Sequence, residues 1–63
     1  MFEEAELLTI ESLRGNEGKT AAKELAEIWD KYKGTNEARN CFCNRQKRIR
    51  FIKDFYEWFT DNK

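Results

Sequence analysis

The 63-residue sequence contains no histidine and no proline, and it has only two cysteines and three glycines. Histidine is the commonest general base and metal ligand in proteins, so its absence removes the usual centre of a catalytic or zinc site. No apolar run approaches the roughly 20 residues that a membrane-spanning helix needs. A chain of this length forms one small domain, here residues 1–63, whose core is too small for a buried substrate pocket. We therefore expect neither an enzyme nor a membrane protein, and no cofactor.

Charge is balanced overall but unevenly distributed along the chain. Twelve Lys and Arg residues offset twelve Asp and Glu residues, so the formal net charge is zero. Residues 1–11 contain four glutamates and no base, whereas residues 39–53 contain six cations and no acid. A local excess of positive charge indicates a partner of opposite sign, either a nucleic acid or an acidic protein surface. The alternative is that the acidic N-terminal segment folds back onto the basic segment and neutralises it.

Glycines divide the sequence into three segments of helix-forming residues. Residues 2–14 are rich in Glu, Ala and Leu, which favour helix. In residues 19–33 apolar side chains recur at spacings of three and four, and Gly34 follows where a helix C-terminal glycine belongs. Thr35 is a suitable N-cap for a third helix over residues 36–60. The sequence therefore predicts an all-α fold, a small helix-turn-helix-like bundle of three helices, or four if the third is interrupted.

The expected third helix is long for so small a bundle. A continuous helix over residues 36–60 would span roughly 37 Å, whereas the first two would each span about 20 Å. A break near Cys43 and Asn44, with Asn44 as a new N-cap, would remove this mismatch and give four short helices. We expect one long or kinked helix rather than two separate ones.

The polar face of this expected helix carries the strongest functional signal. On a helical wheel its residues are amides and cations, with Cys43 the one exception. Amides pair with adenine edges, and Arg or Lys with guanine edges or phosphates. The alternative is an ordinary solvated basic face. Such faces usually mix Glu with Lys, whereas this one contains no acid. We expect a small non-enzymatic, nucleic-acid-binding accessory or regulatory protein. Its contacts would come from Arg39, Asn40, Asn44, Lys47, Arg48, Arg50 and Lys53.

Residues 41–48 of the same segment read Cys-Phe-Cys-Asn-Arg-Gln-Lys-Arg. This stretch resembles the Trp-Phe-x-Asn-Arg-Arg-x-Lys pattern in the recognition helix of homeodomains, with Cys41 in place of the core tryptophan. The matching residues are Phe42, Asn44, Arg45 and Arg48. The resemblance implies a helix-turn-helix layout in which Phe42 is buried, Asn44 reads an adenine in the major groove and Arg48 holds a phosphate.

Aromatic side chains crowd the C-terminal half of the third segment. Phe51, Phe55 and Trp58 widen its apolar arc to nearly half of the helical cylinder, more than one neighbouring helix can cover. Either this helix is wedged between the other two, the commoner arrangement in so short a chain, or these residues face a partner. In the second case the protein is an interaction module. It would resemble small phage virion components or inhibitors of a host protein, docking onto a larger assembly or pairing as a homodimer.

Cys41 and Cys43 form a Cys-x-Cys pair. Without histidine, two thiolates cannot complete a tetrahedral zinc site in one chain, so we expect no metal. On a helix the two side chains would point about 200° apart, which prevents a disulfide between them. We expect both thiols to be reduced, as in a protein of the cytoplasm of the producing or host cell, with Cys41 buried and Cys43 more exposed.

Overall fold

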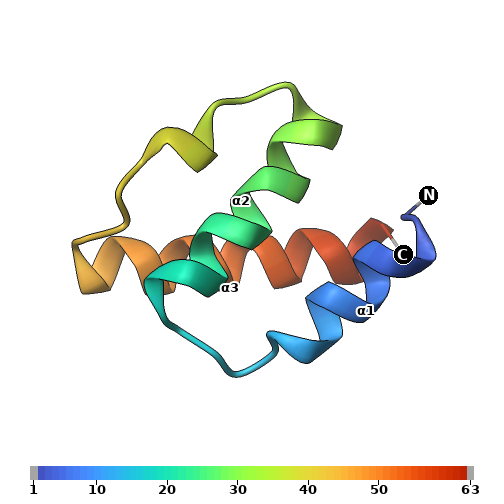
Figure 1. Ribbon diagram of the computed structural model, residues 1–63, viewed down its shortest axis with the longest axis horizontal. Coiled ribbons are helices and arrows are strands. Elements are labelled where there is room, and N and C mark those ends of the chain that lie inside the picture. The colour runs from blue at the N-terminus through green and yellow to red at the C-terminus, as the bar shows by residue number, and fades with distance from the viewer. Residues whose placement is uncertain (1, 63) are drawn as a thin grey trace.

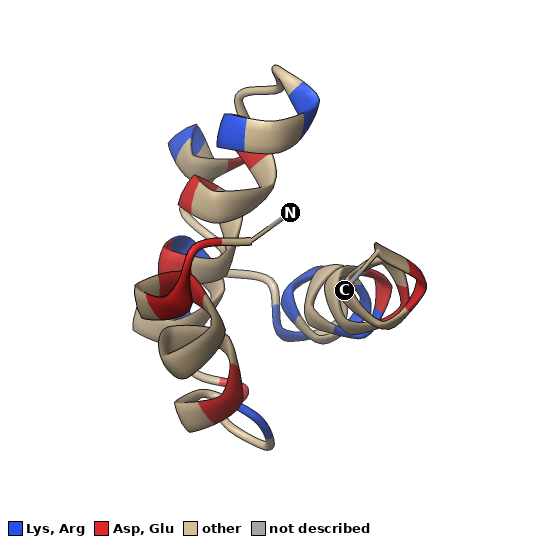
Figure 2. Cartoon of the chain, turned by 90° about the vertical axis from the view of Figure 1, so that its right-hand side faces the viewer, with Lys and Arg blue, Asp and Glu red and all other residues tan. Residues whose placement is uncertain are grey.

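The computed structural model describes residues 2–62, and over that range the regular structure is helical, which confirms the predicted all-α class. Helix α1 spans Glu4–Ser12, α2 spans Lys19–Lys33, the short 3₁₀ helix η1 spans Glu37–Arg39 and α3 spans Arg45–Asn62. Helices α1 and α2 form one layer and α3 runs beside them (Figures 1 and 2). At about 27 Å, α3 nearly matches the 30 Å long dimension of the molecule. No helix in the described range is both long and apolar enough to cross a membrane.

Helix α2 has the boundaries that the sequence predicts. Its buried side chains are Ala21, Ala22, Leu25, Ala26 and Ile28. Gly34 ends the helix with a φ of +68°, and its N–H donates to the carbonyl of Asp30 at 2.8 Å. Glycine suits this position because a left-handed backbone is costly for residues with a Cβ atom. The helix expected over residues 2–14 is shorter at both ends, since α1 begins at Glu4 and ends at Ser12.

The long helix expected over residues 36–60 is wrong in its first nine residues. The carboxylate of Asp30 accepts the backbone N–H groups of Glu37 and Ala38 at 2.8 and 2.9 Å, and these bonds hold the chain in one 3₁₀ turn. Residues 40–44 are non-helical. Asn44 then caps α3, because its Oδ1 accepts the N–H of Lys47 at 3.0 Å. The chain thus follows the alternative with a break at Asn44, and Thr35 donates to Asp30 at 2.5 Å instead of capping a helix.

One hydrophobic core joins the two layers. Its buried members are Ile10, Ala22, Leu25, Ala26, Ile28, Phe42, Ile52, Phe55 and Phe59. The ring of Trp29 lies 5.4, 6.1 and 5.3 Å from the rings of Phe51, Phe55 and Trp58, so α2 covers much of the aromatic arc of α3. Phe2 adds a ring contact to Trp58 at 5.3 Å. Residues of α2 and the N-terminal segment therefore cover much of the wide arc within the chain.

Candidate nucleic-acid interface

The break before α3 divides the predicted polar face into two adjoining hollows. The first follows the opening turns of α3 and is lined by Asn44, Gln46, Lys47, Ile49, Arg50, Lys53 and Asp54. The second lies over the preceding segment and includes Asn40, Asn44 and Lys47. Five of the seven predicted residues therefore remain on one connected surface, which we name the basic surface: Asn40, Asn44, Lys47, Arg50 and Lys53.

The other two predicted residues lie elsewhere. Arg39 is exposed at the end of η1 and lines neither hollow. Arg48 is half-buried, and its guanidinium donates to the carbonyl of Glu17 at 2.6 Å and to that of Phe42 at 2.9 Å. These bonds tie the α1–α2 loop to the segment before α3. The structure thus gives Arg48 an internal role, and its predicted contact with nucleic acid stays a prediction.

The cations of the basic surface have no acidic partners within the described part of the chain. The ion pairs there join Arg14 to Glu11, and Lys31 to both Glu3 and Glu6. The acidic N-terminal segment therefore does not neutralise residues 39–53. Its carboxylates instead bind a lysine of α2.

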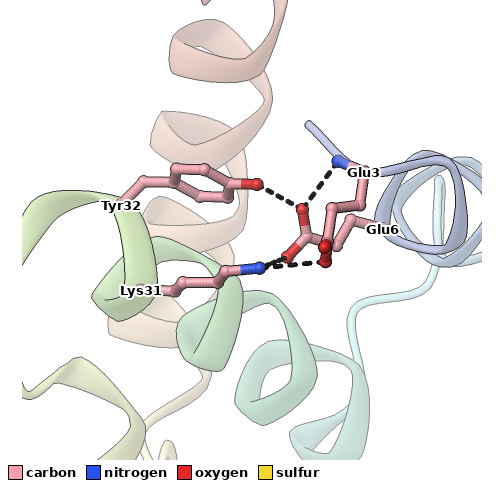
Figure 3. A network of polar contacts seen from close by, with 4 residues as sticks. All are labelled: Glu3, Glu6, Lys31 and Tyr32. Atoms are coloured by element: carbon pink, nitrogen blue, oxygen red, sulfur yellow. Dashed lines mark hydrogen bonds and ion pairs between the residues drawn. The ribbon is translucent and has the colours of Figure 1, made fainter. Parts of the chain in front are cut away.

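That acidic cluster is a polar network at the end of the molecule where both termini lie (Figures 1 and 3). Lys31 Nζ lies 3.0 Å from Glu3 Oε2 and 2.8 Å from Glu6 Oε2, and Tyr32 donates its hydroxyl to Glu6. Burial raises the pKa of Glu6, but the bonds from Lys31, Tyr32 and the Glu3 N–H together outweigh it and lower the pKa from its ordinary 4.5 to about 2. The start of α3 lies at the opposite end (Figure 1), so the two charge clusters are well separated.

Two further lysines add to the positive field near the basic surface. Lys19 and Lys23, in the opening turns of α2, act electrostatically on the thiols of the segment before α3, Lys19 on both and Lys23 on Cys43. Sequence reasoning missed these lysines, because their approach to residues 41–43 depends on how α2 packs against the later part of the chain. No local pattern carries that information.

The homeodomain-like positions do not form a recognition helix. Phe42 is buried, as the resemblance implies. Asn44, however, is the N-cap of α3, and residues 40–43 before it are non-helical, so Asn44 does not lie within a recognition helix. No protein-family model matches the sequence, and no curated protein or solved structure is significantly similar to it. Neither the fold nor these comparisons support membership of that family.

The aromatic residues predicted as an alternative protein interface lie largely inside the molecule. Phe55 is fully buried, and a partner could not reach it without opening the core. Phe51 and Trp58 are half-buried against Trp29. Among residues 2–62 the large apolar side chain that is left exposed is Leu8, at 67%. Leu8 lies on α1 and did not stand out in the sequence.

Both cysteines are exposed, so the expected burial of Cys41 is wrong. Because residues 41–43 are not helical, the expected separation of the two side chains on opposite helix faces is also wrong. Phe42, between them, enters the core in their place.

Proposed function

We propose that the protein binds nucleic acid non-enzymatically, with the basic surface contacting the phosphate backbone. The observation that carries this proposal is the row of exposed cations at Lys47, Arg50 and Lys53, which form no ion pair within residues 2–62. On a helix, residues three apart lie about 5–6 Å from one another, so the three charges form a continuous row. Backbone contacts of this kind supply affinity without requiring a recognition helix in the major groove.

The composition of the surface favours nucleic acid over an acidic protein. Protein interfaces usually contain a buried aromatic or aliphatic anchor. The basic surface carries amides and cations around half-buried Phe51, with one acid at its edge, Glu37, which accepts from Asn40 at 2.8 Å. The exposed Leu8 belongs to α1. Amide side chains beside a row of cations suit phosphates and base edges instead. The row ends where Asp54 borders the hollow, which limits the surface to a few phosphates.

Fluorescence anisotropy with a labelled duplex of about 30 base pairs and a single strand of equal length tests the proposal. If three phosphates are neutralised, raising the salt from about 50 to 200 mM weakens duplex binding by about 40-fold. Each of the substitutions Lys47→Gln and Arg50→Gln should weaken binding and reduce the salt slope by about 1.

Lys33→Gln is the matched control, because it makes the same exchange at an exposed lysine of α2 that lies over Trp29 and Trp58 and lines neither hollow. It should leave the salt slope unchanged. Absence of binding to both nucleic acids at low salt would refute the proposal. Equal effects of Lys33→Gln and Lys47→Gln would show that net charge, and not this surface, governs binding.

A further inference from the structure

The segment between η1 and α3 places two thiols on the same exposed side of the molecule. Side chains alternate along a non-helical segment, so Cys41 and Cys43 point outward while Phe42 points inward. These are the only cysteines in the sequence. A hydrogen bond also connects the two residues, since the backbone N–H of Cys43 donates to Cys41 Sγ at 3.3 Å.

Phe42 anchors the segment that carries the two cysteines. Its φ is +54°, a left-handed conformation that costs about 1–2 kcal/mol for a residue with a Cβ atom. The strain is offset because the ring is buried 5.2 Å from the ring of Phe51, and the carbonyl accepts from Arg48. Two contacts then join the cysteines across Phe42: the N–H of Cys43 donates to Cys41 Sγ, and the Cys43 thiol donates to the Cys41 carbonyl at 3.8 Å.

The two thiols are also chemically unequal. Hydrogen bonds from the Cys43 side chain and from the Cys43 N–H, together with the charge of Lys19, lower the pKa of Cys41. The side-chain interaction with Cys41 raises the pKa of Cys43, whose thiol donates to the Cys41 carbonyl. The thiolate is the nucleophile in disulfide chemistry, and nearby cations favour it. Because its Sγ accepts the N–H of Cys43, Cys41 is the better attacking thiol, and Cys43, bonded to the same residue, is the thiol that would resolve the product.

We propose that Cys41 and Cys43 form a dithiol site that undergoes thiol–disulfide exchange with small anionic disulfides of the glutathione class. The Cys41 thiolate attacks one sulfur of the disulfide, the S–S bond breaks, and one thiolate leaves and takes up a proton. Cys43 then loses its proton and attacks Cys41 in the mixed disulfide, which releases the second thiol. The protein dithiol is oxidised to a Cys41–Cys43 disulfide, and the small disulfide is reduced to two thiols.

The positive field around the site selects the charge of the substrate. Lys19 and Lys23 act on the thiols, and Lys47 lines the same hollow as both cysteines. One acid, Glu37, also lines the hollow and accepts a hydrogen bond from Asn40, so the three lysines outnumber it. The carboxylates of an anionic disulfide would be attracted to this field, as charged substrates are to clefts of opposite sign. A neutral disulfide of similar size would not be attracted to this field. The thiol exchange does not depend on nucleic-acid binding, although Lys47 belongs both to this hollow and to the row of cations along α3.

The test treats the reduced full-length protein with oxidised glutathione, quenches the reaction with acid and measures the mass. The wild type should lose two hydrogens and retain no glutathione. Cys43→Ser should instead accumulate one glutathione on Cys41, several-fold faster than Cys41→Ser accumulates it on Cys43. A wild-type product that is a stable glutathione adduct, or a disulfide-linked dimer, would overturn the proposal.

Two comparisons separate a built site from ordinary exposed cysteines. Cys43→Ser unfolded in urea should react with glutathione disulfide several-fold more slowly than the folded variant. The neutral disulfide of mercaptoethanol should react more slowly than oxidised glutathione at low salt, and high salt should remove the difference. Equal rates for the folded and unfolded variant would refute an activated Cys41. Equal rates for the two disulfides at low salt would refute selection of an anionic substrate.

Discussion

Replacing Glu6 with glutamine should destabilise the fold through the network at the start of α1. The Glu6 side chain is only 12% exposed, and its carboxylate accepts from Lys31, from Tyr32 and from the N–H of Glu3. These bonds join α1 to the last turn of α2 (Figure 3). Glutamine keeps the size of the side chain and one acceptor oxygen, but it removes the negative charge that attracts Lys31.

The expected loss follows from the pKa of Glu6. A pKa lowered from 4.5 to about 2 corresponds to at most about 3–4 kcal/mol of folding free energy at pH 7. The side chain of Lys31 is 50% exposed, so solvent screening reduces the loss to about 1–2 kcal/mol. In a domain of this size that change lowers Tm by about 5–15 °C.

The pH dependence has a definite sign. Because the folded-state pKa of Glu6 lies below the unfolded value, its contribution is fully present above about pH 5. It is then lost as the pH falls from 4.5 through about 2. Glu6→Gln should therefore be less stable than wild type at pH 7 and equal to it near pH 2.

Urea unfolding followed by tryptophan fluorescence at the two pH values measures this difference. Glu4→Gln is the control, since Glu4 is an exposed glutamate of the same helical turn. It should change the free energy of unfolding by less than about 0.5 kcal/mol. A Glu6→Gln loss no larger than that of the control, or one that persists undiminished at pH 2, would refute the reasoning.

Three further substitutions test the segment between α2 and α3. Arg48→Met removes two charge-assisted hydrogen bonds to carbonyls and should lower the free energy of unfolding, measured in urea, by about 2 kcal/mol. Arg45→Met, at an exposed neighbouring position, is the control and should lower it little. Equal losses would contradict the internal role of Arg48. Asp30→Asn should speed the hydrogen exchange of backbone amides in residues 37–39, measured by NMR, because the amides of Glu37 and Ala38 lose their carboxylate acceptor. Unchanged exchange rates would show that the 3₁₀ turn does not depend on Asp30. Gly34→Ala should cost about 1 kcal/mol. An added Cβ meets nothing within 4 Å there, so D-alanine at the same position should be tolerated, and equal costs for both enantiomers would contradict a conformational origin.

The sequence determined the helical class and the whole of α2, because the signals for both are local. The spacing of apolar residues and the position of Gly34 determine the helix through residues only one or two turns away. The helix expected over residues 36–60 failed for the opposite reason. A helical wheel shows a continuous apolar face there, but it does not register that Asp30 captures the N–H groups of Glu37 and Ala38. Nor does it show that Phe42 has a left-handed backbone and a buried ring.

For the candidate site, the sequence by itself determined that cations and amides gather near the start of α3. Only the tertiary structure decided which of them are free. Arg48 is held by the carbonyls of Glu17 and Phe42, and the acidic segment binds Lys31 instead of the basic one. The physical reason is that the availability of a charged side chain depends on partners far away in the chain. Those partners are chosen by the packing of the core, whereas the local clustering of charge is already present in the unfolded polypeptide.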